Sequence, residues 1–323
     1  QSEAAGCSPG QCPPTTLVKT TQPLGLAVAG TTIYWRTGAG GLMSASVDGT
    51  GVSTVFASPD DAVGIDDGSQ LDDLLVGSTS AYFIVNRYPH TQAYVRAVLL
   101  DGTGASTLDV DTNIANREQA FALDATSLYV ARRYIDPQGG SCPDVGIDVV
   151  PLNGGPTTTL SGACELVRLV VDSSQNLYWT DLGPPPFIVA PSVMTQSVSA
   201  AKPTKLASAV SPGGIALYGG MLYWSDSGTG DVMVMPVGGT MGASVLSSSA
   251  HPWDLVVDSS GVYWVDSGTA VMRAPLGGGA ATTIAQGQVN IVALGTDATS
   301  VFWVNEGTSG AGYVDGAVMK VAK

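Results

Sequence analysis

Arginine is concentrated in one part of the chain, and it is well suited to binding an anion. Six of the eight arginines lie between residues 87 and 168. A guanidinium group forms paired hydrogen bonds with carboxylate, sulfate or phosphate. We therefore predict a ligand-binding set that combines five arginines with aromatic residues: Arg87, Arg117, Arg132, Arg133, Arg168, Trp253, Tyr88 and Tyr134. The alternative is that these arginines pair with acidic residues nearby in sequence, such as Glu118 or Glu165.

Residues able to carry acid–base or metal chemistry are few. The chain has two histidines, His90 and His251, which argues against a histidine-rich metal site. If the protein is an enzyme, His251 is the candidate acid or base; otherwise it is a loop residue. Asp73 and Asp254 are candidate ligands for Ca²⁺, because hard cations prefer oxygen ligands. Glycine-rich segments lie in turns with no following helix, so a phosphate-binding loop is not expected.

A repeat supplies the framework for these residues. Aromatic runs such as Leu222-Tyr223-Trp224-Ser225-Asp226 recur along the chain, each followed by a Val/Met-rich run and a glycine turn. The equivalent positions, spaced by 39 to 49 residues, are Trp35, Phe83, Val130, Trp179, Trp224, Trp264 and Trp303. This periodicity predicts seven units of an all-β propeller.

Each unit is expected to hold four antiparallel strands, with the aromatic run as the second. The predicted first strands begin at Leu26, Leu74, Phe121, Leu169, Ile215, Leu255 and Ile291. The seventh unit lacks a fourth strand, and the pattern from Thr15 to Lys19 matches the fourth strand of the sixth unit. The N-terminal segment is therefore predicted to complete the last blade, which leaves few open sheet edges. We expect an exposed tail over residues 1–14 and one propeller domain over residues 15–323.

The two ends of such a ring are predicted to differ. Short turns such as Asp48-Gly49 and Asn153-Gly154 follow the third strands at one end. The loops between second and third strands are longer and individual, and they share the other end with the connections between blades. Variable loops on a regular scaffold usually carry binding. Asp73, Arg168 and Asp254 occupy equivalent positions in their units, where the chain reaches the centre of the ring.

Cysteine usage suggests an exported protein. The four cysteines allow three pairings, of which we favour Cys7–Cys12 and Cys142–Cys164; the second joins two segments expected at the same end of the ring. No histidine pattern accompanies them, so zinc is not expected. An extracellular, periplasmic or cell-surface location follows as a prediction.

The negative net charge of the protein limits which partners it is expected to bind. The net charge is −14, and only 12 % of the residues are charged. This balance argues against nucleic acid as a partner. No run of 18 apolar residues is present, so membrane insertion is not expected.

The repeats resemble a known class of propellers. Tyr178-Trp179-Thr180-Asp181 and Tyr223-Trp224-Ser225-Asp226, with weaker copies in the last two units, resemble the YWTD propellers of the low-density-lipoprotein-receptor family. They are also similar to bacterial NHL and gluconolactonase-like propellers. The sequence departs from the pattern in units 1 to 3, where Thr37, Val85 and Arg132 replace the aspartate. The Trp and Asp residues are expected to hold blades together by packing and by bonds to turn amides.

Three functional hypotheses remain open. The first is a binding propeller that recognises a protein or an anionic glycan through its loops. The second, implied by the gluconolactonase-like resemblance, is a metal-assisted lactonase or hydrolase, or a polysaccharide lyase. The third is a structural subunit of a surface assembly. The sequence does not predict the oligomeric state.

Overall fold

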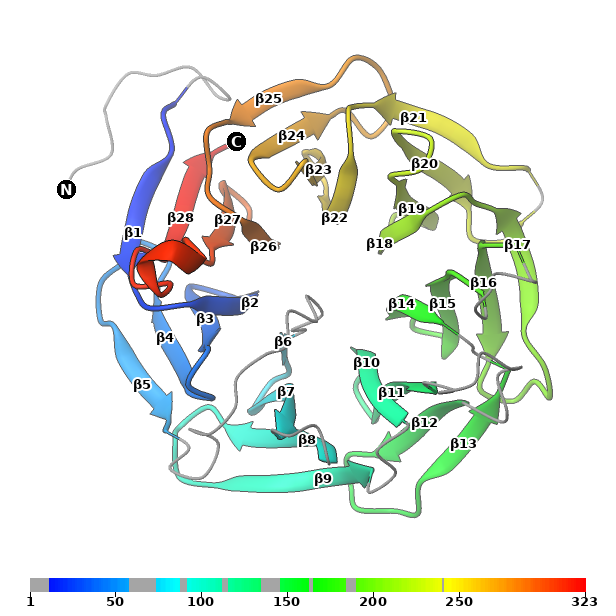
Figure 1. The fold of residues 1–323 in the computed structure, drawn as a ribbon. Helices are drawn as coiled ribbons and strands as arrows, with labels where there is room; N and C mark the ends of the chain where they lie inside the picture. Colours follow the sequence, from blue (N-terminus) through cyan, green and yellow to red (C-terminus); the bar gives the residue numbers. More distant parts are fainter. Residues whose placement is uncertain are drawn as a thin grey trace.

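Seven four-stranded antiparallel sheets stand around a central axis in the computed structural model, forming a seven-bladed β-propeller (Figure 1). The structure describes residues 12–57, 74–87, 92–111, 116–134, 146–162, 165–183, 190–239 and 241–323. For residues 84–87, 92–94, 109–111, 116–119, 132–134 and 161 it describes the backbone alone. The predicted fold class and blade number are confirmed.

The strands follow one another from the axis outward in every blade. The first three blades are β2 (Pro23–Ala29), β3 (Thr32–Thr37), β4 (Leu42–Ser46), β5 (Ser53–Phe56); β6 (Leu74–Val76), β7 (Ser80–Arg87), β8 (Gln92–Leu99), β9 (Ala105–Asp111); and β10 (Asn116–Leu123), β11 (Ser127–Tyr134), β12 (Gly146–Pro151), β13 (Thr158–Ser161). The next three are β14 (Leu166–Val171), β15 (Asn176–Asp181), β16 (Ser192–Ser197), β17 (Thr204–Ser208); β18 (Pro212–Tyr218), β19 (Met221–Asp226), β20 (Asp231–Pro236), β21 (Ser244–Ser248); and β22 (Pro252–Asp258), β23 (Gly261–Asp266), β24 (Ala270–Ala274), β25 (Thr282–Ala285).

The seventh blade is built from both ends of the described chain. It contains β26 (Ile291–Thr296), β27 (Ser300–Asn305) and β28 (Ala317–Ala322), with β1 (Thr15–Lys19) as its outer strand. Strand β1 runs antiparallel to β28, with Thr15 opposite Lys320 and Lys19 opposite Ala317. The predicted closure by residues 15–19 is therefore confirmed, and Figure 1 shows the blue and red strands side by side.

The core lies between neighbouring blades. Successive side chains of a strand point to opposite faces, so Tyr and Trp of each second strand contact different neighbours. Tyr223 in blade 5 packs with Trp264 in blade 6, and Tyr178 in blade 4 packs with Trp224 in blade 5. All seven anchor residues, Trp35, Phe83, Val130, Trp179, Trp224, Trp264 and Trp303, are 0 % exposed. Truncating a ring in such a core typically costs about 3–5 kcal/mol, so the repeat primarily encodes cohesion between blades.

Five of the first strands begin earlier than the sequence predicts. Strands β2, β10, β14, β18 and β22 each start three to five residues before their predicted beginnings, and a register shift interrupts each of them. In β18, for example, the shift lies between Pro212 and Ile215. A β-bulge breaks the alternation of apolar and polar residues, so the hydrophobic pattern reveals only the regular half of each strand.

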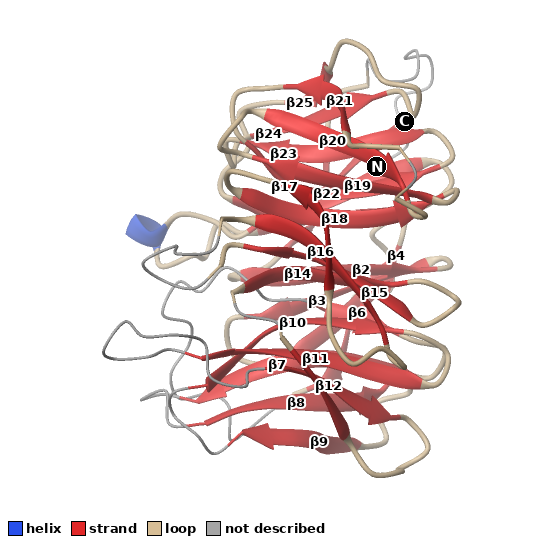
Figure 2. Ribbon diagram, turned by 90° about the vertical axis from the view of Figure 1, so that its right-hand side faces the viewer, coloured by secondary structure: helices blue, strands red, loops and turns tan. Residues whose placement is uncertain are grey.

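Helical structure is nearly absent from the described residues. The single helix there is η1, a 3-10 helix over Ser309–Ala311, which projects from one end of the ring in Figure 2. Within the same residues, no helix is long and apolar enough to span a membrane. Residues 1–11 of the predicted tail lie outside the described part of the chain.

Candidate functional site

The two ends of the ring use their polar side chains differently. At the turn end, where first strands turn into second and third strands into fourth, aspartates accept backbone N–H groups two residues further on. These bonds run from Thr50 to Asp48 (2.9 Å), Thr103 to Asp101 (2.9 Å), Thr126 to Asp124 (2.7 Å), Ser174 to Asp172 (2.8 Å), Ser260 to Asp258 (2.8 Å) and Thr299 to Asp297 (2.7 Å). The acidic groups of this end thus stabilise their own turns.

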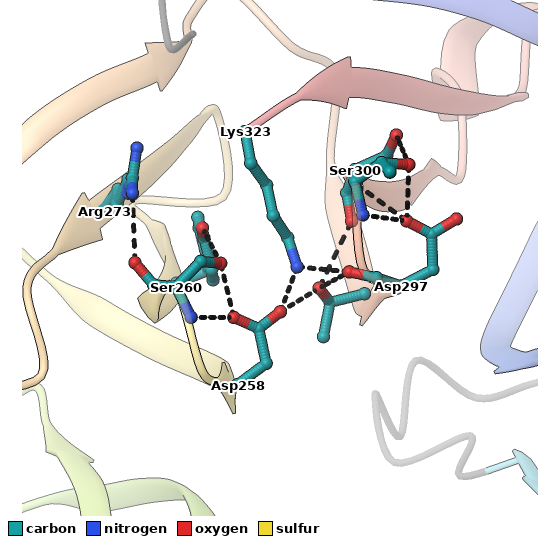
Figure 3. Close-up of polar contacts among 9 residues, drawn as sticks. Asp258, Ser260, Arg273, Asp297, Ser300 and Lys323 are labelled. Atoms are coloured by element: carbon teal, nitrogen blue, oxygen red, sulfur yellow. Dashed lines mark hydrogen bonds and ion pairs between the residues drawn. The ribbon is translucent and has the colours of Figure 1, made fainter.

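A lysine joins blades 6 and 7 at the turn end. The Nζ of Lys323 donates to the carboxylate of Asp258 and to the backbone carbonyl of Asp297 (Figure 3). It also lies 5.4 Å from the ring centroid of Tyr263, and the lysine side chain is only 7 % exposed. Burial alone would raise the pKa of Asp258, but hydrogen bonds from Lys323, Ser260 and Thr296 lower it to about 2. The contacts of this cluster are internal, and we assign it a structural role.

At the opposite end, called the loop end, the aspartate of the repeat holds the connection that enters its own blade. Asp226 accepts the N–H groups of Val210 (2.9 Å) and Ser211 (2.8 Å), just before β18. Asp266 accepts the N–H of His251 at 2.7 Å, just before β22. The predicted bonding of these aspartates to turn amides is therefore confirmed. Blades 1 to 3, with Thr37, Val85 and Arg132 at this position, have no such carboxylate.

The hydroxyl before that aspartate links one blade to the next. Thr180 of β15 donates to the carbonyl of Gly213 in blade 5 at 2.7 Å. Ser225 of β19 donates in the same way to the carbonyl of Trp253 in blade 6. Both hydroxyl residues are 0 % exposed. Blades 4, 5 and 6 are thus joined near the axis by two buried hydrogen bonds that the sequence analysis did not predict, although Thr and Ser recur at the position.

An ion pair spans the same three blades. The Nε of Arg168 in β14 lies 3.9 Å from a carboxylate oxygen of Asp254 in β22. Blade 5, between them, has Gly214 at the equivalent position, where an added Cβ would lie 3.1 Å from the Cα of Asp254. No side chain of β18 therefore stands at that position between the two charges. The predicted convergence of Arg168 and Asp254 holds; Asp73, the third predicted member, lies outside the described residues.

This pair is largely shielded from water. The side chains of Arg168 and Asp254 are 13 % and 16 % exposed. The second carboxylate oxygen of Asp254 accepts the N–H of Leu294 in blade 7 at 3.3 Å. Burial raises the pKa of Asp254, and Arg168 opposes that shift. At an effective dielectric constant of about 20, attraction over this distance is about 4 kcal/mol, which offsets part of the desolvation cost of the two charges.

Calcium does not fit the described donors around Asp254. Its carboxylate faces a guanidinium, which disfavours a second cation, and the described residues include no group of three or more His, Cys, Asp or Glu able to hold a metal ion.

Trp253 and His251 lie beside the pair on the same chain segment. Trp253 is half-buried against blade 5, where a Cβ on Gly213 would lie 3.2 Å from its ring. Glycine at position 213 therefore makes room for the indole. His251 is exposed at the loop end. Its imidazole is accessible, and its backbone is fixed by Asp266.

The other predicted arginines, Arg87, Arg117, Arg132 and Arg133, lie on strands. Arg87 ends β7, and β10 and β11 pair Arg117 with Arg133 and Glu118 with Arg132. Tyr134 ends β11, opposite Asn116. Strands β7, β10 and β11 extend beyond their apolar portions. Charged residues at the ends of such strands resemble loop residues in sequence. Their backbones bring four basic residues to the loop-end portions of blades 2 and 3; Tyr88 lies outside the described residues.

Of the four cysteines, only Cys12 lies among the described residues. Cys12 is disulfide-bonded. Cys7, Cys142 and Cys164 lie outside the described residues, so the pairings Cys7–Cys12 and Cys142–Cys164 stay predictions.

Comparison with known proteins supports the architecture. No protein-family model matches the chain, and no curated protein matches it in sequence. Among solved structures, a streptogramin B lyase superposes with a TM-score of 0.68 at 10 % identity, covering 96 % of this chain and 97 % of the lyase. YCF48 bound to a D1 peptide gives 0.66 at 11 % identity, covering 96 % of each chain. A nidogen/laminin complex gives 0.53 at 16 % identity, covering 76 % of this chain and 89 % of the matched chain.

These similarities establish one point. The chain is a seven-bladed propeller. At such low identity a shared fold carries no shared chemistry, so the resemblance to YWTD propellers extends to the architecture and the repeated Tyr-Trp positions. The function must be argued from the loop end itself.

Proposed function

We propose that this protein is a binding propeller that holds a protein or an anionic glycan at its loop end, without converting it. The observation that carries the proposal is the contrast between the ends. At the turn end, repeated aspartates are bonded within their own turns. At the loop end, Trp253 is half-buried, His251 is exposed, and the connections between second and third strands differ in length. Variable loops on a rigid scaffold favour recognition.

The charge at this end favours an anionic group in the ligand. In the backbone register Arg117 lies opposite Arg133 and Arg132 lies opposite Glu118, and Arg87 ends the neighbouring hairpin. Guanidinium groups bind carboxylates and sulfates in bidentate fashion. A ligand that bridges blades 2 and 3 would therefore place its acidic groups along this side of the ring.

Two of the similar structures agree with a binding role. They are described as a nidogen/laminin complex and as YCF48 bound to a D1 peptide. The disulfide-bonded state of Cys12 supports an oxidising location such as the extracellular space or the periplasm. We therefore propose an exported protein whose partner is met outside the cytoplasm.

An array that carries uronate-containing and sulfated glycans together with acidic peptides tests the proposal. We expect binding that weakens at least tenfold in Arg132→Gln/Arg133→Gln. The matched control, Lys202→Gln/Lys205→Gln, removes the same charge at exposed positions of blade 4 and its third-to-fourth-strand turn. Equal losses in both variants would indicate attraction to net charge alone and would contradict a site on blades 2 and 3.

The same array distinguishes binding from catalysis. One similar structure is a streptogramin B lyase, and His251 is the exposed candidate acid or base. A binding protein should leave a bound polyuronate intact over hours. Release of unsaturated or shortened products, abolished in His251→Ala, would replace the binding assignment with a lyase or hydrolase.

A further inference from the structure

At the described positions around the centre of the ring, two opposite charges lie among small residues. In each blade, one residue of the first strand lies opposite the buried anchor residue of the second strand. The residue just before it occupies an equivalent position near the axis in every blade. At the described positions these residues are Gly25, Ala120, Arg168, Gly214, Asp254 and Ala293. Among these six, four bear at most a methyl group. Arg168 and Asp254 are therefore the two charged residues among the described positions of this layer; Asp73, which the alignment places at the seventh position, lies outside the described residues.

The support around this pair is rigid. The hydroxyls of Thr180 and Ser225 donate to the backbone carbonyls of Gly213 in blade 5 and Trp253 in blade 6. Asp226 and Asp266 fasten the chain just before β18 and β22. Binding groups held by supporting hydrogen bonds keep their geometry without a ligand. The blades that carry the ion pair thus form a preorganised platform, with the Trp253 ring packed on Gly213 beside it.

The closeness of the two charges restricts what can bind between them. A simple carboxylate that approaches Arg168 also meets the negative charge of Asp254, only 3.9 Å from the guanidinium. A simple amine that approaches Asp254 meets Arg168 in the same way. A group with an adjacent carboxylate and ammonium avoids both repulsions, because each of its charges faces its opposite. The geometry selects against ligands of single charge.

We propose that the Arg168–Asp254 pair binds a zwitterionic α-amino-acid group, with the carboxylate toward Arg168 and the ammonium toward Asp254. The half-buried ring of Trp253 then contacts an apolar side chain of the same ligand. This inference rests on the proposed binding function of the loop end and specifies the chemical group read at its axis. Because a polypeptide holds its α-amino and α-carboxyl groups in peptide bonds, the axial group is a free amino acid or an amino-acid substituent of the ligand. The acidic groups that bind blades 2 and 3 are separate from it.

Three small probes test the assignment on the unaltered protein. They are L-phenylalanine, its N-acetyl derivative, which lacks the ammonium, and its amide, which lacks the carboxylate. Calorimetric titration, with the Trp253 indole signal followed by NMR, should show millimolar or tighter binding of L-phenylalanine. Each derivative should bind at least tenfold more weakly. L-phenylalanine should be tested up to about 20 mM, which is on the order of ten times a weak millimolar Kd. Absence of binding at that concentration, or equal binding of all three probes, would overturn the zwitterion proposal.

Charge-removing variants then give results of opposite sign. Asp254→Asn should weaken L-phenylalanine at least tenfold while strengthening the N-acetyl derivative, because a repulsive carboxylate is removed. Arg168→Gln should weaken L-phenylalanine and strengthen the amide. Asp48→Asn, the same type of change at the turn end, should alter none of these affinities. Thermal unfolding of each variant identifies any loss that arises from misfolding.

The two proposals fail in different ways. If the N-acetyl derivative binds as tightly as L-phenylalanine and Asp254→Asn affects both equally, the zwitterion assignment is wrong while anion binding at the loop end stands. If L-phenylalanine binds as expected but the arrays show no dependence on Arg132 and Arg133, the axial site stands and the proposed ligand surface on blades 2 and 3 is wrong.

Discussion

Thr180 in blade 4 donates its hydroxyl to the backbone carbonyl of Gly213 in blade 5 at 2.7 Å. Ser225 repeats the contact one blade further on, with the carbonyl of Trp253. The third residue of the Tyr-Trp-Thr/Ser-Asp repeat is therefore a link between blades. Blade 6, with Val265 at the same position, has an apolar side chain there.

Thr180→Val should destabilise the protein without changing its fold. Valine has nearly the shape of threonine, but it leaves the buried carbonyl of Gly213 without the Thr180 donor. An unsatisfied buried acceptor costs about 1–3 kcal/mol, which denaturant unfolding can measure. Thr54→Val, on the exposed outer strand β5, is the control and should change stability by less than about 0.5 kcal/mol. Equal effects at both positions would show that the interblade bond contributes nothing.

Asp226→Ala should be more costly than the loss of an ordinary surface carboxylate. Asp226 is 3 % exposed and accepts three backbone N–H groups, from Val210, Ser211 and Gly228. Hydrogen bonds to a charged group contribute about 1.5–3 kcal/mol each, but losses are not additive, so we expect a total near 3 kcal/mol. Asp231→Ala, which loses one contact to Ser248 in the same blade, is the matched control. Similar unfolding midpoints for the two variants would contradict this role.

The turn end should control stability in acid. The pKa values of Asp124 and Asp258 are lowered to about 2, because hydrogen bonds outweigh the effect of burial. A lowered carboxyl pKa means that the unfolded chain binds protons more readily, so this stabilisation is complete above about pH 4 and is lost as the pH falls toward 2. Urea unfolding between pH 2.5 and 7 should show the decline. Asp258→Asn should make it shallower; an unchanged slope would exclude Asp258 as a source.

Trp253 should be the tryptophan that a dissolved quencher reaches. Five of the six tryptophans are 0 % exposed, whereas Trp253 is half-buried at the loop end. Iodide should therefore quench about one sixth of the fluorescence if the rings emit equally, and Trp253→Phe should abolish that fraction. L-phenylalanine bound at the axis should protect it. Quenching that survives in Trp253→Phe would mean that blade interfaces open in solution.

The features that could be predicted from the sequence are those that repeat along the chain. Tyr223 and Trp224 predicted a buried second strand because equivalent residues recur at blade-like spacing, and Thr15 to Lys19 predicted the closing strand by matching β25. The positions of Arg168 and Asp254 followed from the same alignment. Their contact did not, because it depends on Gly214 leaving space between them and on the diameter of the ring. The hydroxyl links were missed because Thr180 and Ser225 suit an ordinary strand equally well.

Strand β1 has a consequence for how the molecule is made. Thr15 contacts Lys320 across a separation of 305 residues. Contacts so distant in sequence form late and slow folding. During synthesis, residues 15–19 therefore wait without their β-sheet neighbour until β28 has left the ribosome. A nascent chain of six blades presents an unpaired strand and an unfinished ring, so chaperone dependence should be greatest after β25 and before β28 has emerged.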